Sequence, residues 1–596
     1  MAHGRRQASA GTTVLPLALI AAVGVLAYSN SLDVPFQWDG DAYIGGSPVV
    51  KDFGYFLEPD RAAGMELHGA LKSRYIGYLS FALSYAIGGL EPTGYHLFNI
   101  AVHLLNALLV YALVLTSYRT PKLREGVLAV RAESVALLAS LLFVAHPVQT
   151  EAVTYIFQRL ASLAACFYLL SLLAYARARL SSRRGSAALL HAACLLAAVL
   201  AMKTKENAFT LPLAAVLYEL VFFTGPLKPR LLRLVPLLLT LAIIPLTLAG
   251  AEQSAGDLLG GLVPATRGFE DLSRSVYFLT ELRVVVTYLR LLVLPVAQNF
   301  DYDYPVFRSL LAPQVLGSLL LLSSLAGLAV FLLYRSRSGV RDTAAIAFGI
   351  FWFFLTLSVE SSIVPIPMLI NEYRLYLPSV GAFLAFSTGA FLLLERLRDA
   401  RARSVAQAVL FALPLVLALA TYSRNVVWAS RISLWEDVVS KSPSRVYPRN
   451  NLGIAYTEAG RIDDAVRQFQ TALAIDPEHA SSYSNLGVLR ARQGRLDEAM
   501  RAFRAALLYD PELVDAHNNT GLVHLAQGRY EAAEQSFRAA MRLDPGYAKA
   551  HYNLGVCFEQ QGRFDEADDE LREALRLDPG YAKARAALEA LARQRM

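Results

Sequence analysis

Charged residues are scarce in this chain, because only 18% of its 596 residues are charged and 55% are hydrophobic. The mean hydropathy is +0.38, which excludes the composition of an ordinary soluble enzyme. The net charge is a modest +7, and the basic residues stand in short clusters between apolar runs. This distribution argues against a nucleic-acid partner.

Cysteine is also scarce. Cys166 and Cys194 lie in apolar segments and Cys557 lies near the C-terminus, with no spacing typical of a disulfide framework or a metal knuckle. The N-terminal "MAHGRRQ" and "TVLPLALIAAVGVLAY" have the basic and apolar regions of a signal peptide, but no small-x-small cleavage site follows. We therefore assign the cysteines no function and predict an uncleaved first membrane span.

Long apolar runs are what the chain has instead. Runs of membrane length fill residues 13–422, whereas the remainder is rich in Ala, Arg, Glu, Asp and Gln. We expect an all-α protein with a polytopic membrane domain over residues 1–423, a connecting partial repeat over 424–445 and a soluble helical array over 446–596 that ends in a capping helix.

The basic clusters predict the topology, because loops on the cytoplasmic side carry the excess of Lys and Arg. The clusters are Arg5 and Arg6, and residues 118–131, 177–184, 224–233, 335–341 and 395–403. Spans placed between them give about 11 crossings and a cytoplasmic N-terminus. Residues 71–88 and 276–296 do not fit the alternation. The second carries Glu281, Arg283 and Arg290, at about 2.5–3.5 kcal/mol each in lipid, so we expect interfacial or re-entrant helices.

This topology places several polar segments together on the outer, periplasmic side of a cell (inner) membrane. They are residues 31–70, 146–151, 203–206, 251–275, 298–312 and 361–372, with everything after about 422. A functional site facing a lipid-borne substrate is expected among them.

The C-terminal part repeats with a period of 34 residues, which is the period of the tetratricopeptide repeat (TPR). The repeated positions are Gly453, Gly487, Gly521 and Gly555, and Pro477, Pro511, Pro545 and Pro579. Trp435 is in register with Phe469, Phe503 and Phe537, which indicates a partial repeat at the start of the array. The pattern predicts an α-solenoid, and such arrays mostly bind peptides or proteins along a concave face.

An asparagine recurs at one position of the first helix of each repeat, namely Asn451, Asn485, Asn519 and Asn553. A side-chain amide both donates to and accepts from an extended peptide backbone. The series resembles the asparagine ladder in the repeats of cytosolic O-GlcNAc transferases, and so these residues are candidates for binding an acceptor peptide. The alternative is that the asparagines serve the packing of one repeat on the next.

The membrane half carries the motifs of a known family. The runs are "YSNSLDVPFQWDGDAYI", "YLSFALSYAIGGLEPTGYHLFNIAVHLLNALLVY", "LLFVAHPVQTEAVTYIFQRLASLAACFYLLSLLAY", "KTKENAFTLPLAAVLYEL" and "NEYRLYLPSVG". They resemble the tetratricopeptide-containing transmembrane O-mannosyltransferases, and high Ala, Leu and Arg usage indicates a bacterial-type member. The resemblance implies a GT-C fold and a sugar donor carried on polyprenyl phosphate. The family shows adjacent acids where this chain has Asp39, Gly40 and Asp41.

A positioned carboxylate is the group that such a transfer needs first, because a Ser or Thr hydroxyl is a poor nucleophile until its proton is removed. Asp39 is the candidate base and Asp41 the second candidate catalytic acid. A polyprenyl phosphate leaves as a stable anion, so one acid suffices, and the single displacement inverts the anomeric centre.

Cations are expected to hold the donor phosphate. The candidates are Arg374, Lys205, Lys203 and Arg159. Arg374 is favoured because a guanidinium binds phosphate oxygens in a bidentate way. The alternatives are that the lysines extend toward the interface from a span end and that Arg159 pairs with an acid.

Further side chains on the same side are candidate donor or acceptor contacts: His96, His146, Glu151, Glu206, Glu372 and Tyr373. His146 and Glu151 with Asp39 would make a metal site, but the spacing is not a metal signature. We expect no required cofactor, with a divalent metal as the alternative.

The sequence and the resemblance together predict an enzyme that moves a hexose from polyprenyl phosphate to exported proteins, which the repeats recruit. The resemblance implies that the hexose is mannose. Its partners are the lipid-linked sugar, the acceptor protein and the bilayer, with no nucleic acid. One alternative is a transferase that acts on an envelope glycan or lipid. The other is a membrane and TPR scaffold without enzymatic activity.

Overall fold

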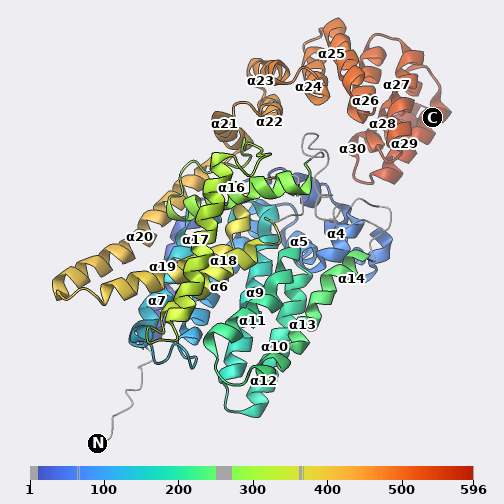
Figure 1. Ribbon diagram of the computed structural model, residues 1–596. Coiled ribbons are helices and arrows are strands. Elements are labelled where there is room, and N and C mark those ends of the chain that lie inside the picture. The colour runs from blue at the N-terminus through green and yellow to red at the C-terminus, as the bar shows by residue number, and fades with distance from the viewer. Residues whose placement is uncertain are drawn as a thin grey trace, which may run out of the picture. The chain divides into compact units, whose positions relative to one another are not determined.

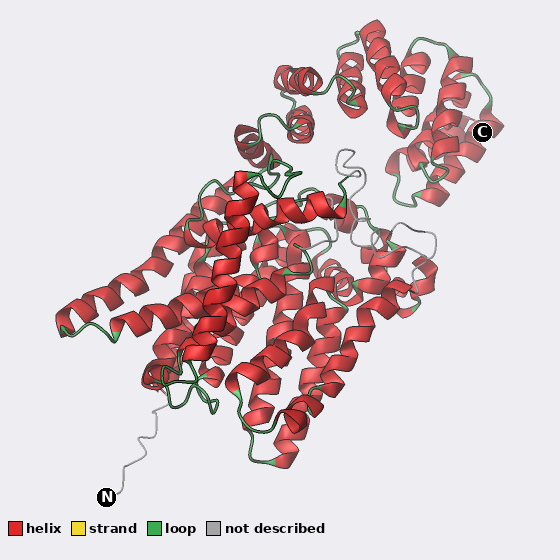
Figure 2. Ribbon diagram, viewed as in Figure 1, coloured by secondary structure: helices red, strands yellow, loops and turns green. Residues whose placement is uncertain are grey.

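The computed structural model describes residues 11–594 except 63, 64, 66, 250–271, 362–365 and 367. Arg5, Arg6 and most of the predicted outer loop 251–275 lie outside the described residues. Within the described part every regular element is a helix, and no strand occurs (Figure 2), which confirms the all-α prediction. The chain divides into two compact units, one up to Leu434 and one from Trp435 onward.

The described residues of the first unit include six helical segments long and apolar enough to cross a membrane, which confirms a multi-pass helical domain. They are α6 (Pro92–Ser117), the segment Val127–Ala145 that includes α7 (Ala132–Ala145), the segment Ile156–Leu180 that includes α9 (Arg159–Leu180), α10 (Arg184–Met202), α17 (Pro313–Arg335) and α20 (Ala400–Val427). Shorter apolar helices cover Val14–Tyr28, Val235–Thr247, Thr343–Leu357 and Pro378–Leu394. The expected number of crossings stays a prediction.

The segment that contains α9 is the interior helix of the bundle. In the most apolar 18-residue stretch of this segment, 89% is buried by the rest of the protein. The corresponding buried shares for α17 and α20 are 22% and 17%. Small residues such as Ala161, Ala164 and Ala165 let neighbouring helices approach α9 closely. Among the candidate spans α6 and α10 pack against α9, whereas α20 is peripheral.

The two segments expected to be interfacial or re-entrant form α5 (Tyr75–Gly88) and α16 (Arg274–Val293). Neither is among the candidate spans in the described part of the chain. In Figure 1, α16 runs across the direction of most other helices of this unit.

The second unit is a stack of antiparallel helix pairs in chain order (Figure 1). The helices are α22 (Val446–Glu458), α23 (Ile462–Ile475), α24 (Ala480–Arg492), α25 (Leu496–Tyr509), α26 (Val514–Ala526), α27 (Tyr530–Leu543), α28 (Ala548–Gln560), α29 (Phe564–Leu577) and a final α30 (Ala582–Gln594). The repeated glycine is required for close approach, because a Cβ atom on Gly487 would lie 2.7 Å from the Phe503 ring. Trp435 lies in α21 (Arg431–Lys441), which leads into the array, and is buried.

Candidate functional site

The segment after α1 (Gly11–Tyr28) carries the two candidate acids, and Asp41 begins a short π-helix over Asp41–Gly45. Trp38 has a φ of +47°, a strained value for a bulky residue, and this sharp turn directly precedes Asp39. The backbone N–H of Asp39 donates to the Tyr155 hydroxyl at 3.1 Å, and the carboxylate also interacts with this hydroxyl. The residue as a whole is partly buried, and the Tyr155 hydroxyl holds both its N–H and its carboxylate.

The environment of Asp39 makes its carboxylate more basic than usual. Burial raises the pKa of Asp39 to about 6, and the hydrogen bond from Tyr155 and the positive charge of Arg74 oppose this rise. A carboxylate with this pKa is ionised at neutral pH and accepts a proton more readily than an ordinary aspartate.

Asp41 lies in a different environment, two residues further along. Its Oδ2 atom accepts a hydrogen bond from Arg431 Nη2 at 2.6 Å, and the two charges form an ion pair. Arg431 is the first residue of α21. The expected second catalytic acid is therefore engaged in a contact between two segments that lie far apart in the sequence.

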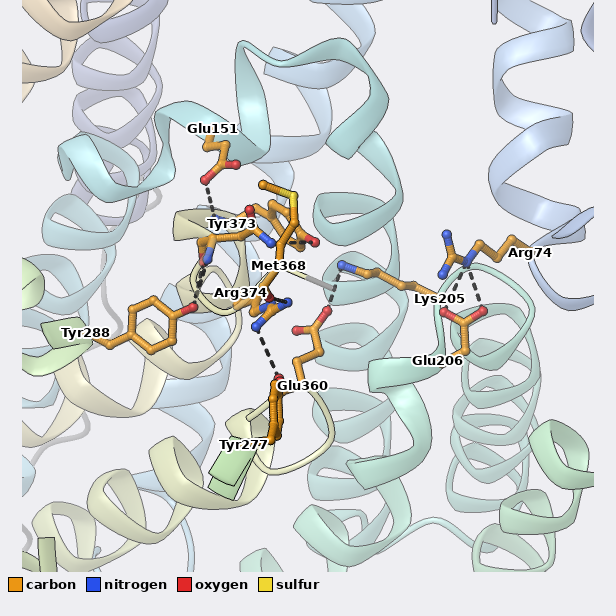
Figure 3. Close-up of polar contacts among 11 residues, drawn as sticks. Arg74, Glu151, Lys205, Glu206, Tyr277, Tyr288, Glu360, Met368, Tyr373 and Arg374 are labelled. Carbon is orange, nitrogen blue, oxygen red and sulfur yellow. Dashed lines mark hydrogen bonds and ion pairs between the residues drawn. The ribbon is translucent and has the colours of Figure 1, made fainter. Parts of the chain in front are cut away.

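Arg74, which the sequence analysis did not single out, connects Asp39 to the predicted cations. Its Nε atom donates to both carboxylate oxygens of Glu206, at 2.8 and 3.0 Å (Figure 3). The side chain of Arg74 is 12% exposed, and its charge acts on Asp39 as well as on Glu206. Burial alone would raise the pKa of Glu206, but the ion pair with Arg74 outweighs it and holds that pKa below its usual value. Glu206 is thus an ionised partner of Arg74.

Lys205 lies next to this pair. Its ammonium forms an ion pair with Glu360 at 2.9 Å and lies 4.2 Å from the centre of the Tyr373 ring (Figure 3). The structure therefore brings Lys205, Glu206 and Tyr373, three of the predicted residues, into one cluster with Arg74 and Glu360.

Arg374 lies between Tyr373 and Glu360 in Figure 3, and its guanidinium points toward main-chain carbonyl groups. Its Nη1 atom donates to the carbonyl oxygens of Glu360 and Leu369 at 3.3 and 3.1 Å, and Nη2 donates to that of Met368 at 2.6 Å. The side chain is only 2% exposed. Arg374 thus fastens the main chain at Glu360, Met368 and Leu369.

Glu151 and Glu372 form a buried pair of carboxyl groups. Burial, followed by the charge of Glu372, raises the pKa of Glu151 to about 8, so Glu151 is protonated at neutral pH. Its Oε2 atom accepts from the Tyr373 N–H at 3.0 Å (Figure 3). Glu372 accepts hydrogen bonds from the Tyr302 hydroxyl at 2.6 Å and from the Asn299 N–H at 2.8 Å. Both acids thus fasten the segment that contains Tyr373 and Arg374.

The expected phosphate ligand Arg159 lies apart from the cluster, at the start of α9. Its guanidinium donates to Asn99 Oδ1, Ser80 O, Ser84 Oγ and Tyr95 O at 2.7–3.1 Å. It also lies over the ring of Phe98 at 4.4 Å, and it is fully buried. This geometry gives Arg159 a packing role between α9, α5 and α6 and gives no support to phosphate binding, because four of its donor bonds are already formed.

The histidines are held by the backbone. His96 Nε2 lies 2.8 Å from Val34 O, and His146 Nδ1 accepts from Val148 N–H at 3.2 Å while its Nε2 lies 3.2 Å from Leu292 O. Burial lowers the pKa of His146 to about 4. The described residues hold no group of three His, Cys, Asp or Glu side chains placed to bind a metal, so His146, Glu151 and Asp39 do not converge there.

Two of the ladder asparagines contact the preceding repeat. Asn485 donates to Asn450 Oδ1 at 2.9 Å, and Asn553 donates to Asn518 Oδ1 at 2.8 Å. All four ladder positions are half-buried. The geometry thus favours the packing interpretation for Asn485 and Asn553, whereas Asn451 and Asn519 make no such bond to a preceding repeat within the array.

Comparisons with known proteins agree with the motifs. A family profile described as "Tetratricopeptide repeat" matches residues 450–512, 492–548 and 518–582. The chain is 26% identical to protein O-mannosyl-transferase Tmtc3 of Drosophila melanogaster, over 79% of this chain and 56% of that protein. It is 25% identical to protein O-mannosyl-transferase TMTC1 of Homo sapiens, over 78% and 55% respectively.

The chain is a relative of the TMTC protein O-mannosyl-transferases. This confirms the family expected from the sequence. The chain spans about half the length of these two relatives. Among solved structures, a crystal structure of MamA is 25% identical over 26% of this chain and 89% of its own, with a TM-score of 0.23.

Proposed function

We propose that this chain is a GT-C glycosyltransferase that moves a hexose from polyprenyl phosphate to Ser or Thr hydroxyls of exported proteins. The observation that carries the proposal is the placement of Asp39, a partly buried carboxylate with a pKa of about 6 on which the charge of the buried Arg74 acts. The names of the relatives support mannose as the sugar and protein as the acceptor.

In the proposed reaction Asp39 removes the proton of the acceptor hydroxyl as its oxygen attacks the anomeric carbon. The bond from that carbon to the phosphate oxygen breaks at the same time, and polyprenyl phosphate leaves as an anion. The anomeric centre is inverted, because the attacking and leaving oxygens lie on opposite faces of the sugar. A leaving phosphate needs positive charge and no acid, so a single catalytic carboxylate suffices.

Arg74 and Lys205 are the side chains best placed to stabilise that anion. Arg74 is bound through Nε to Glu206, which orients its guanidinium, and its charge acts on Asp39. Lys205 forms an ion pair with Glu360, which a phosphate group would displace. Arg374 supports the same region through its bonds to the carbonyl oxygens of Glu360 and Leu369.

The proposed location is a cell membrane crossed many times, with the Asp39 loop and the TPR array both on the outer side. The array would then recruit the acceptor near the membrane surface, as such solenoids bind extended peptides. No metal takes part in the proposed steps.

The test is a transfer assay with the purified full-length protein, a panel of polyprenyl-phosphate sugars and an extract of exported proteins. We expect transfer from the mannose donor, and a loss of at least 10²-fold in Asp39→Asn, because general-base catalysis contributes roughly 10²–10⁴-fold. Unchanged transfer in Asp39→Asn would overturn the assignment of the base. Transfer only to envelope glycans or lipids would favour the alternative transferase, and no transfer from any donor would favour a scaffold.

A further inference from the structure

Tyr155 lies between two short helices, α8 (Thr150–Val153) and a 3₁₀ helix over Ile156–Gln158. The side chain of Asn99 donates to the last carbonyl group of the first helix and to the first carbonyl group of the second, at 3.1 and 3.4 Å. Asn99 Oδ1 in turn accepts a hydrogen bond from Arg159 at 2.7 Å. The main chain on both sides of Tyr155 is therefore fastened to α6.

The ring of Tyr155 is held by other aromatic rings. It stacks on the Trp428 indole, with ring centres 5.7 Å apart and an interplanar angle of 25°, and it meets the Phe300 ring edge-on at 5.5 Å. Phe300 also meets the ring of Trp38, the residue of positive φ that precedes Asp39. Tyr155 is 3% exposed. Its hydroxyl group thus has a fixed position next to the segment that carries Asp39.

The Tyr155 hydroxyl binds both the main chain and the side chain of Asp39. It accepts the Asp39 N–H at 3.1 Å, and it donates its own proton to the Asp39 carboxylate. A phenol has only one proton to donate, so it binds one of the two carboxylate oxygens. Because one atom of Tyr155 engages both ends of Asp39, it restricts the rotation of the carboxylate.

We propose that Tyr155 is the positioning residue of the base, and that its hydroxyl binds one carboxylate oxygen of Asp39 and leaves the other directed at the acceptor hydroxyl. The proposal rests on the proposed function and adds a residue to it. Tyr155 does not touch the substrate, because the acceptor proton passes to Asp39 as polyprenyl phosphate leaves. Loss of the hydroxyl would misalign the carboxylate and would also remove a hydrogen bond that stabilises its ionised form.

The other titratable groups in this region stay constant in the test. Those that act on Asp39 or on the Tyr155 hydroxyl, together with the neighbouring ion pair, are Arg74, Tyr78, Glu151, and Asp41 with Arg431. The Tyr155 variants described below keep all of them. A change in the pKa of Asp39 therefore reports the effect of the Tyr155 hydroxyl.

The test measures kcat/KM against pH with the full-length protein in lipid nanodiscs. Tyr155→Phe keeps the ring that packs on Trp428 and Phe300 and removes only the hydroxyl group. We expect the midpoint to rise from near pH 6 by about one pH unit, because the lost hydrogen bond lowered the pKa of Asp39. At pH 8.5 kcat should still be about tenfold lower because of misalignment, and the KM for the donor should change less than about twofold.

Tyr168→Phe is the matched control. Tyr168 is fully buried, meets the Trp352 ring edge-on at 5.4 Å and forms a hydrogen bond with Thr210 at 3.2 Å. Its substitution removes a comparable buried hydroxyl from α9, outside the Asp39 segment, so the midpoint should stay near pH 6. A second variant carries 3-fluorotyrosine at position 155. Because its hydroxyl is a stronger donor, the midpoint should fall below that of the unsubstituted protein.

A second measurement follows the ionisation of Asp39 without transfer. Dicyclohexylcarbodiimide reacts with protonated carboxyl groups, and tandem mass spectrometry assigns the modification to Asp39. The pH midpoint of this modification should shift as the kinetic midpoint does. An unchanged midpoint in Tyr155→Phe, an equal rise in Tyr168→Phe or no fall with 3-fluorotyrosine would overturn the proposal.

The proposed function fails by a different result. If Asp39→Asn keeps its transfer activity, Asp39 is not the base, and Tyr155 has no base to position even where the carbodiimide midpoint shifts. If Asp39→Asn loses transfer while both midpoints of Tyr155→Phe stay near pH 6, the base stands and only the role of Tyr155 is refuted.

Discussion

At the scale of single residues, two acids that stand two positions apart differ because their surroundings differ. Asp39 is half-buried against Tyr155 and has a raised pKa, whereas Asp41 is bound to Arg431. The sequence alone could not separate these roles, because Arg431 is 390 positions away from Asp41. The environment therefore assigns the proposed base to Asp39.

The raised pKa of Asp39 predicts the pH dependence of transfer. The base must be ionised, so kcat/KM should fall about tenfold per pH unit below pH 6 and should level off above it. Steady-state kinetics between pH 4.5 and 8.5 measure the midpoint. Asp41→Asn should keep a midpoint near pH 6, because Asp41 is engaged by Arg431. A profile that is flat down to pH 5 would contradict the role of Asp39.

The buried pair of Glu151 and Glu372 predicts an effect on stability. The pKa of Glu151 is raised to about 8 in the folded protein from a usual value of 4.5. The folded state binds this proton more tightly, so the free energy of unfolding falls from about pH 4.5 to pH 8 and is lowest above pH 8. Glu151→Gln should therefore raise the Tm at pH 8 relative to the unsubstituted protein and change it little at pH 4.5.

The matched variant Glu372→Gln should lower the Tm at both pH values. Glu372 accepts hydrogen bonds from Tyr302 and Asn299, and an amide offers only one acceptor oxygen. Thermal unfolding in nanodiscs measures both variants. If Glu151→Gln and Glu372→Gln changed the Tm in the same way at both pH values, the different roles given to Glu151 and Glu372 would be refuted.

At the scale of elements, the start of α9 is fastened to α5 and α6 through Arg159. Sequence reasoning placed Arg159 near the outer end of a helix and offered phosphate binding as its role. Its partners, Ser80, Ser84, Tyr95 and Asn99, lie 60 to 79 positions away, so only the fold reveals that its donors are used.

This role predicts that Arg159→Met destabilises the protein and does not act on the donor specifically. The free energy of unfolding should fall by about 1.5–3 kcal/mol or more, because one hydrogen bond to a charged group contributes that much. The KM for the donor, measured on the fraction that stays folded, should stay within about twofold. A large rise in the KM for the donor at an unchanged Tm would contradict the packing role and support phosphate binding by Arg159.

At the scale of the whole molecule, the sequence predicts periodic structure well. It predicts poorly which side chains from distant segments come together in the site. The 34-residue period and the apolar runs of membrane length correctly predicted the TPR array and the multi-pass helical domain, because both depend on local periodicity. The site depends on long-range pairs instead. Arg74 was missed because its partner Glu206 is 132 positions away, and nothing in the sequence around Arg74 points to that pairing.

The topology predicts which segments a membrane-impermeant thiol reagent reaches in intact cells. Cys166, Cys194 and Cys557 are all buried, so the unsubstituted protein should show little labelling. Asp60→Cys and Glu478→Cys, both at exposed positions, should react from outside. Ser338→Cys should react only after the membrane is permeabilised. Labelling of positions 60 and 478 from opposite sides would refute the proposed arrangement.

The enclosure of α9 has a consequence for biosynthesis. Protein covers almost all of the segment that contains this helix once the chain has folded, yet the mean hydropathy of its apolar window is 1.7. Ribosomes synthesise α9 before α10, so it enters the membrane while one of its eventual neighbours does not yet exist. Its apolar side chains must therefore be compatible with lipid tails first and with adjoining helices afterwards. A substitution that the finished protein tolerates can still prevent insertion of the nascent chain.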